Sequence, residues 1–306
     1  MEYLSLAGKW EAKLKDGSTY PMQIPGTLDE NQIGGKDLGA NQWHPDADLG
    51  NAEKGFDPDA PIATRYTRKY TYEGEAGISR NVSYIPEEEK RVFLEVERAR
   101  CLKLEIDGKE VPDYVEPSIS TPHIFEVTDL LDGEHRITLR SDNSYLGLPH
   151  DAIVFSSAAT DETQTNWNGL LGYVRLRTER EVFLSAVRVY PEKDRVHVQV
   201  IIDGSVPVKG ILRIQSAALE KAAEQEVNVP AGIHTIWLRD LKLKADVKKW
   251  DEGEGNLYEL TAELRDGDCK TVTFGVRDFG DDGKGHLALN GRRIFLRSET
   301  NCCEFP

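Results

Sequence analysis

Alternation of apolar and polar residues, interrupted by two-residue turn signals, limits the fold of this chain more than any other sequence feature. In RVFLEVE (91–97) and RVHVQVII (195–202), valine or leucine occupies every second position. A period of two places those side chains on one face of an extended segment. The pattern recurs from end to end and predicts strands with one buried face.

Turn dipeptides between these segments predict hairpins at Asp107-Gly108, Asp266-Gly267 and Asn290-Gly291. Helical periodicity is short. TDLL (128–131) is typical of one capped turn, and SAALEKAAEQEV (216–227) is the only longer helical candidate. We therefore expect a mainly β protein.

The charge balance restricts the partners. The 306 residues include 38 Lys and Arg against 53 Asp and Glu, a formal net charge of −15. This charge opposes binding to nucleic acid or to an anionic membrane surface. No stretch approaches the length of a membrane span, and the first residues lack a signal-peptide pattern. We expect a soluble chain, cytoplasmic unless a removed leader directed it to the periplasm or outside.

Four cysteines, spaced irregularly and without a CxxC pair, predict mostly reduced thiols. The seven histidines show no metal-ligand spacing. DFGDDGKGHLAL (278–289) imitates a calcium loop, but Leu289 stands where such a loop needs glutamate. No cofactor or metal is predicted.

Differences in loop length and strand spacing divide the chain into three parts. Residues 1–181 carry long polar loops, and residues 182–277 have the regularly spaced short strands of a β-sandwich. Residues 278–306 form a Gly- and Asp-rich connector followed by a hairpin and a closing strand, which we expect to be buried.

Six motifs occur in an order that resembles glycoside hydrolase family 2 over nearly the full length. They are SLAGKWEAKL (5–14), RITLRSDN (136–143), TNWNGLLGYVRL (165–176), WDEGEGNLYEL (250–260), FGVRDF (274–279) and LALNGRRIFLRSETN (287–301). The resemblance implies a jelly-roll sugar-binding domain at 1–181, an immunoglobulin-like sandwich at 182–277, and at 278–306 the linker and first strand of a catalytic (β/α)8 barrel. Such a barrel takes about 250 residues, so the chain resembles the front part of a longer hydrolase.

Glycoside hydrolysis uses two carboxylates that flank the scissile bond. In the family both lie on later barrel strands, so the resemblance implies no catalytic residue in this chain. Glu87, Glu88 and Glu89 are adjacent carboxylates, but PEEEK predicts a solvated turn. We expect the chain alone to be inactive.

Asn166 is the sharpest candidate for sugar contact. Related β-galactosidases and β-glucuronidases carry an Asp six residues before a Gly that matches Gly172, and that Asp touches the sugar. Here the position holds Asn166, whose amide can still bond hydroxyl groups. Alternatively, Asn166 and Asn168 shape a turn through their amides; both interpretations stay open.

Two tryptophans are further candidates. Trp167 could stack on a sugar ring or fill an interface, and packing is favoured because tryptophan is more often core. Trp43 lies in a polar loop, where loop anchoring is favoured over sugar stacking.

The closing segment departs from the family pattern. Ser298 follows Arg297 where the family usually has Gly, and Asn301 or Cys302 stands where a sugar-contacting His is expected. Arg297 is predicted to be a buried charge whose carboxylate partner lies in the later barrel.

These features favour the non-catalytic front of a retaining exo-hydrolase, with β-galactoside as first candidate substrate and β-mannoside or β-glucuronide next. A stand-alone carbohydrate-binding or adhesion module, or a purely structural pair of domains, is the alternative. Under the hydrolase interpretation an open apolar patch is expected around Leu287, Leu289, Ile294, Phe295 and Leu296, which would favour self-association.

Overall fold

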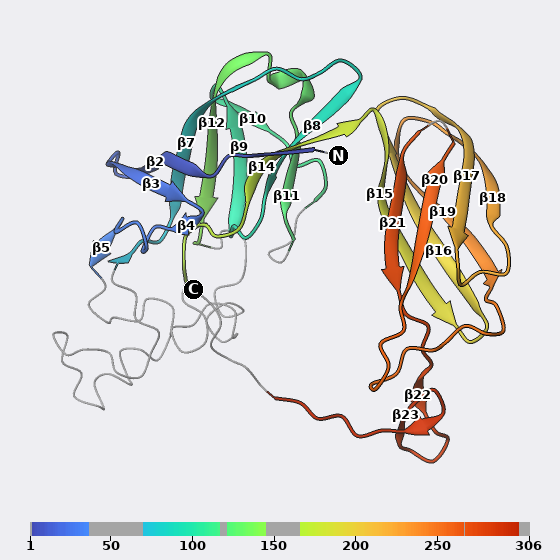
Figure 1. Cartoon of the computed structure of the whole chain (residues 1–306). Helices are drawn as coiled ribbons and strands as arrows, with labels where there is room; N and C mark the ends of the chain where they lie inside the picture. The colour runs from blue at the N-terminus through green and yellow to red at the C-terminus, as the bar shows by residue number, and fades with distance from the viewer. Residues whose placement is uncertain (1, 37–69, 117–120, 145–165, 266, 300–306) are drawn as a thin grey trace, which may run out of the picture. The chain divides into compact units, whose positions relative to one another are not determined.

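The computed structural model describes residues 2–36, 70–116, 121–144, 166–265 and 267–299 (Figure 1). The chain divides into two compact units, the first running to Thr178 and the second spanning Glu179–Glu299. Strands dominate both, and the one helical element among the described residues is the 3-10 turn η1 (Thr128–Leu130). The expected all-β sandwich class is confirmed. No helix in the described part is long and apolar enough to cross a membrane.

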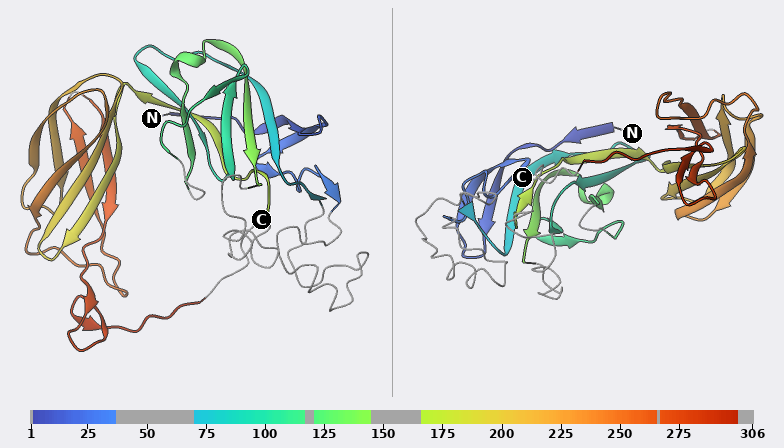
Figure 2. Two further views of the ribbon diagram at one scale, coloured as in Figure 1. Left: turned by 180° about the vertical axis from the view of Figure 1, so that it is seen from behind. Right: turned by 90° about the horizontal axis from the view of Figure 1, so that it is seen from below.

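Unit 1 contains two antiparallel sheets that face each other across a common core (Figures 1 and 2). In sheet order, the six-stranded sheet consists of β10 (Lys109–Val111), β9 (Cys101–Ile106), β12 (Gly133–Asp142), β7 (Glu75–Tyr84), β2 (Gly8–Leu14) and β3 (Thr19–Ile24). The four-stranded sheet consists of β1 (Glu2–Ser5), β14 (Val174–Arg180), β8 (Lys90–Val96) and β11 (His123–Glu126). Two short pairs complete the unit: β4 (Gly26–Thr27) with β13 (Gly169–Leu170), and β5 (Gly35–Lys36) with β6 (Tyr70–Thr71).

Strand β8 is buried on both faces, whereas its sequence predicts one exposed face. Phe93 is fully buried, and Arg91 and Glu95 are nearly so. Arg91 is held by Glu126 on β11 at 2.8 Å, and the Arg177 guanidinium of β14 covers the Phe93 ring. Neighbouring arginines therefore cover the face that alternation assigns to solvent, and they neutralise the glutamate on it.

Unit 2 is a seven-stranded sandwich with its own core. One sheet has the order β15 (Val182–Glu192), β16 (Arg195–Gly204) and β19 (Gly232–Lys242). The other has the order β18 (Ala223–Val229), β17 (Val208–Ser216), β20 (Tyr258–Leu264) and β21 (Cys269–Phe274). In β16, Val196, Val198 and Val200 are fully buried, as the alternation predicts.

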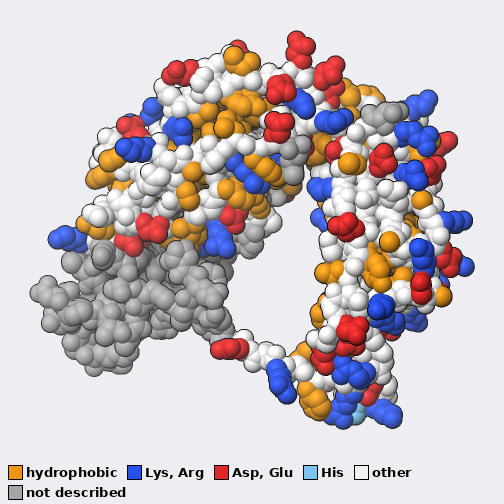
Figure 3. Space-filling model, in the orientation of Figure 1, with side chains coloured by type: hydrophobic (Ala, Val, Ile, Leu, Met, Phe, Trp, Pro, Cys, Tyr) orange, Lys and Arg blue, Asp and Glu red, His pale blue; other side chains and the backbone are white. Residues whose placement is uncertain are grey.

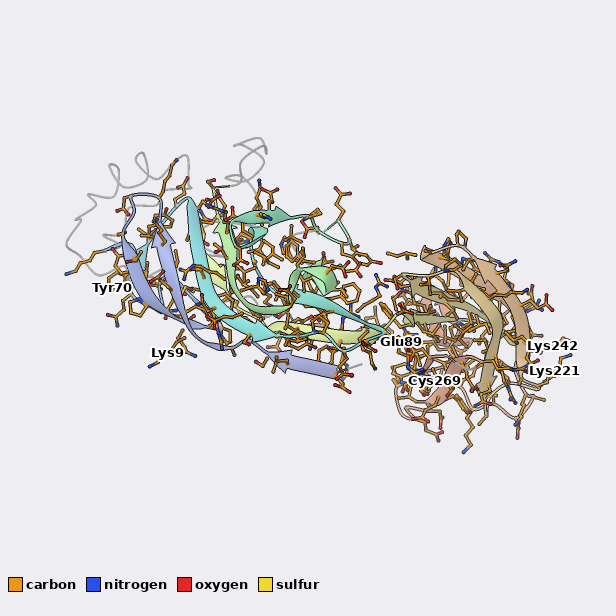
Figure 4. The ribbon with its side chains drawn as sticks, turned by 90° about the horizontal axis from the view of Figure 1, so that it is seen from above. Lys9, Tyr70, Glu89, Lys221, Lys242 and Cys269 are labelled. Atoms are coloured by element: carbon orange, nitrogen blue, oxygen red, sulfur yellow. The ribbon has the colours of Figure 1, made fainter. Side chains whose placement is uncertain are left out.

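The helical candidate at 216–227 is not a helix. Ser216 ends β17, a turn follows, and Ala223 begins β18, which pairs with β17 along its whole length. Leu219 forms a bridge to Leu243, and Figure 4 shows Lys221 of this turn beside Lys242 at the end of β19. Sheet pairing and burial of Leu219 outweigh the helix propensity of the alanines and glutamates.

The hairpins expected at Asp107-Gly108 and Asn290-Gly291 are confirmed. Both residues of each turn have positive φ, 50° and 78° in the first and 53° and 80° in the second, as a type I′ turn requires. Asp266 lies outside the described residues, although β20 and β21 flank it as an antiparallel pair.

A small third sheet follows the unit 2 sandwich. It consists of β22 (Phe279–Asp281), β23 (Leu287–Leu289) and β24 (Arg292–Arg293). The predicted closing strand is thus only two residues long, and residues 294–299 form no strand. Beyond Ile294 the segment is open, with Phe295 76% exposed and Leu296 66%, as expected for these two residues of the apolar patch.

Candidate functional site

The candidate sugar-contacting segment begins at Asn166 and is fixed on one side by strand β4. Gly169 pairs with Thr27 and has φ 129°. A Cβ at this position would lie 2.6 Å from the Gly26 carbonyl oxygen, so only glycine permits the approach. The Leu28 amide donates to the Asn168 carbonyl at 2.8 Å. The backbone on which Asn168 sits is therefore rigidly placed.

The other side of the segment rests on the turn after β8. The Leu171 amide donates to the Arg98 carbonyl and the Gly172 amide to the Glu97 carbonyl, both at 3.1 Å. A Cβ on Gly172 would lie 2.8 Å from that Glu97 carbonyl oxygen and would overlap the Glu97 carboxylate. Both ends of 166–172 are thus clamped by backbone contacts.

Three asparagines, Asn143, Asn166 and Asn168, form a buried group that we call the asparagine cluster. Asn143 follows β12; its Nδ2 donates to the carbonyls of Tyr72 (2.9 Å) and Asn166 (3.0 Å). Its Oδ1 accepts from the Gly74 amide (2.9 Å) and from Asn168 Nδ2 (3.3 Å). The cluster therefore joins the end of β12 to the candidate segment.

The two candidate asparagines donate only inward. Asn166 Nδ2 donates to the Asn143 carbonyl at 3.2 Å, and Asn168 Nδ2 donates to the Gly74 carbonyl at 2.7 Å. Their Oδ1 atoms are buried and accept no hydrogen bond from any residue that the structure describes, and the residues themselves are only 4% and 3% exposed. A buried acceptor left unpaired costs about 1–3 kcal/mol. The cluster therefore contains two hydrogen-bond acceptors that no described residue uses, and both are covered.

Trp167 projects between these asparagines and is half-buried. The guanidinium of Arg100 lies over its ring, with Cζ 4.3 Å from the ring centroid, and Arg100 is itself 5% exposed. One face of the indole is therefore occupied by a cation rather than open for stacking.

A buried histidine lies next to Arg100 and was not singled out from the sequence. His123 Nε2 is 3.3 Å from the Arg100 carbonyl oxygen, and His123 Nδ1 is 3.4 Å from Asp113 Oδ1. Burial raises the pKa of the Asp113 carboxyl, and His123 opposes that rise. The available signal was the alternation of β11, which places His123 on the same inward face as the buried Phe125.

The remaining predicted residues have separate outcomes. Trp43, Asn301 and Cys302 lie outside the described residues. Arg297 is exposed and has no ion pair in the part of the chain that the structure describes; its predicted burial depends on a carboxylate of the later barrel and stays a prediction. Glu87, Glu88 and Glu89 are exposed, as expected for a solvated turn. Of the expected apolar patch, Leu287, Phe295 and Leu296 are exposed, but Leu289 and Ile294 are buried.

No metal centre is evident in the site. Within the described ranges, no three His, Cys, Asp or Glu side chains come together in a way that could hold a metal ion. Cys101 and Cys269 are exposed free thiols.

Solved structures provide the comparison. A family 2 β-galacturonidase from Eisenbergiella tayi matches 96% of this chain with a TM-score of 0.63 and 18% identity. A β-D-mannosidase from Dictyoglomus thermophilum matches 96% with a TM-score of 0.65 and 18% identity. A putative β-galactosidase from Bacteroides fragilis matches 96% with a TM-score of 0.63 and 16% identity. The chain shares its fold with part of these glycoside hydrolases.

Only part of each hydrolase is matched. The chain covers 46% of the galacturonidase, 39% of the mannosidase and 43% of the putative galactosidase. No family model matches this sequence, and no curated protein does either. The likeness therefore establishes the fold.

Proposed function

We propose that this chain is the non-catalytic β-sandwich part of a longer retaining exo-glycoside hydrolase of the family 2 type. In this proposal residues 1–181 form its jelly-roll sugar-binding domain, residues 182–277 an immunoglobulin-like spacer, and residues 278–306 the approach to a catalytic barrel. The observation that carries the proposal is the one-sided coverage: nearly all of this chain matches less than half of each hydrolase.

In this assignment the chain supplies one wall of a sugar pocket. In this proposal Asn166 and Asn168 are the residues of that wall that accept hydrogen bonds from sugar hydroxyls; their Oδ1 atoms, covered in this structure, have no partner among the described residues. The barrel supplies the acid/base and nucleophile carboxylates. Among substrates, β-galactosides come first and β-mannosides and β-glucuronides follow; the matched E. tayi enzyme adds β-galacturonides to the panel.

The test compares the 306-residue chain with the product of its complete reading frame. Nitrophenyl β-galactoside, β-mannoside, β-glucuronide and β-galacturonide serve as probes. We expect hydrolysis of at least one by the longer polypeptide and of none by the chain. A reading frame without a barrel overturns the proposal. Saccharide binding by the chain would then indicate a free-standing binding module.

Asn166→Ala in the longer polypeptide tests the sugar-contact role. Removing one buried hydrogen-bond partner of the substrate costs about 1–3 kcal/mol, which lowers kcat/KM roughly 5- to 150-fold. Asn81→Ala is the matched control because Asn81 is exposed and bonds only Glu134 among the described residues. Equal kinetics of both variants would remove Asn166 from the sugar pocket.

A further inference from the structure

The orientation of the Trp167 indole is decided by a neighbouring cation rather than by hydrogen bonds. Asn166 and Asn168 on either side are fixed through their amides, whereas the indole forms no hydrogen bond with the residues that the structure describes. The Arg100 guanidinium lies over one face of the ring, with its Cζ 4.3 Å from the ring centroid. A desolvated cation in this position binds the ring more strongly than an exposed one. The side chain of Arg100 therefore sets which face of the indole is left open.

Arg100 ends the turn that follows β8, and this turn is held from two directions. On one side the Leu171 amide donates to the Arg98 carbonyl at 3.1 Å, which ties the turn to the candidate segment. On the other side His123 Nε2 lies 3.3 Å from the Arg100 carbonyl oxygen. A carbonyl oxygen only accepts hydrogen bonds, so this ring nitrogen is the donor. His123 therefore fixes the backbone from which the Arg100 side chain starts.

His123 is itself held in place by burial and by Asp113. Its ring lies parallel to that of Phe125 within 9°, with the ring centroids 6.4 Å apart. Its Nδ1 faces Asp113 Oδ1 at 3.4 Å. The Tyr114 amide donates to the Ile124 carbonyl at 2.7 Å, which fixes the loop that carries Asp113 against β11. The carboxyl on one side and the backbone carbonyl on the other thus determine the plane of the ring.

Burial distinguishes this group of side chains from the other charges of unit 1. Figure 3 shows acidic and basic side chains interspersed over the visible surface of the unit. Arg100 and His123 are instead each 5% exposed. Buried polar groups keep their contacts because an unpaired one is costly. A change at His123 should therefore displace Arg100 rather than be compensated by solvent.

We infer that His123, oriented by Asp113, is a positioning residue that holds Arg100 over one face of Trp167 and so presents the opposite face of the indole to the substrate. The substrate part of this inference rests on the proposed function, whereas the placement of the indole does not. A flat aromatic face beside hydrogen-bonding amides suits a sugar ring, which has apolar C–H groups and a rim of hydroxyls.

Nuclear magnetic resonance of the isotope-labelled 306-residue chain tests the placement, with the Trp167 indole N–H resonance assigned through Trp167→Phe. His123→Phe keeps an aromatic ring but removes the donor to Arg100, so we expect that resonance to shift. His123→Gln keeps an N–H donor of similar reach and should leave the resonance at its wild-type position. Arg100→Leu removes the cation itself and should shift the resonance as well.

Two controls separate displacement of the indole from unfolding. The buried Trp10 indole donates to the Leu6 carbonyl at 2.9 Å in unit 1, and its resonance should stay unchanged in every variant. His234→Phe is the matched control for the substitution, because His234 Nε2 also bonds a backbone carbonyl, that of Pro230 at 2.9 Å, in unit 2. It should leave the Trp167 resonance unchanged. Arg100→Leu decides the placement if His123→Phe disturbs Trp10.

In the longer polypeptide, the substrate readout is the split between KM and kcat on the nitrophenyl glycoside that it hydrolyses. A misplaced indole weakens binding of the substrate and of the transition state alike. His123→Phe should therefore raise KM about 2- to 30-fold and leave kcat unchanged. His123→Gln should restore the wild-type KM.

The outcomes separate this inference from the proposed function. An unchanged Trp167 resonance in folded His123→Phe, or an equal shift in His123→Gln, overturns the positioning role. A shifted resonance with an unchanged KM in an active enzyme overturns the substrate role and leaves the proposed function intact. A reading frame without a barrel overturns the proposed function and the substrate role together, whereas the resonances still decide the placement of the indole.

Discussion

At Gly172 the backbone of unit 1 leaves no room for a side chain. Gly172→Ala would place a Cβ 2.8 Å from the Glu97 carbonyl oxygen, which belongs to the backbone and cannot rotate away. Overpacking of this kind costs about 1–3 kcal/mol, and we expect a corresponding loss in the free energy of unfolding by urea. Gly133→Ala is the control, because a Cβ there meets nothing within 4 Å. Equal stability of the two variants would contradict this account.

His135 makes stability depend on pH. Its Nδ1 lies 2.7 Å from Asp107 and its Nε2 2.7 Å from Asp132. The hydrogen bond to Asp107, and to a smaller extent the one to Asp132, raises the pKa of His135 above its ordinary 6.5. The folded state therefore holds this proton more tightly than the unfolded state. The contribution of His135 to the free energy of unfolding is complete below about pH 6.5 and is lost as pH rises through the raised pKa.

Titration of the His135 ring by NMR checks that its pKa is raised. His135→Gln should remove the matching part of the pH dependence of unfolding. In the wild type, a midpoint at or below 6.5 would show that the two carboxylates do not hold the proton.

At the candidate segment, the sequence singles out Asn166 but does not describe its surroundings. Its spacing from Gly172 is local in the chain, so a motif can reveal it. Its hydrogen-bond partner Asn143 is 23 residues away. Arg100, which covers one face of Trp167, directly precedes β9 and is also distant in the sequence. Which atoms of an asparagine remain unpaired depends on such distant contacts, and no spacing encodes them.

Between elements, one glutamate fastens β8 to β14. Glu95 on β8 accepts from Arg177 Nε at 2.5 Å and from Arg175 Nε at 2.8 Å, and its side chain is 7% exposed. Glu95→Ala would leave two largely buried guanidinium groups without this partner, which costs about 3–5 kcal/mol. Urea unfolding should show this loss. The exposed pair Lys103–Glu110, at 3.7 Å, provides the control Glu110→Ala, which should cost at most about 1 kcal/mol.

The elements that could be predicted from the sequence are those whose cause is local. The turns at Asp107 and Asn290 follow from side chains that tolerate positive φ. Residues 216–227 are a helical candidate by local propensity, but the contacts that decide their structure, the pairing with β17 and the bridge at Leu219, are not local. The full burial of β8 was missed for the same reason, since Arg177 reaches it from 82 residues beyond Glu95.

On the scale of the whole molecule, the two units have separate hydrophobic cores. The core of unit 1 includes Leu104 on β9, and that of unit 2 includes Leu212 on β17; the two clusters share no residue. Both leucines are completely buried. Leu104→Ala and Leu212→Ala should each cost about 2–5 kcal/mol, and each loss should stay within its own unit, because sites without common partners act independently.

Amide hydrogen exchange, resolved by peptide, measures this separation directly. Leu104→Ala should speed exchange in the strands of unit 1 and leave unit 2 at the wild-type rate, and Leu212→Ala should do the reverse, since local opening follows cooperative units. The double variant should show the sum of both effects. If either single variant speeds exchange throughout the chain, the two sandwiches unfold as one cooperative body, and the stability of unit 1 depends on that of unit 2.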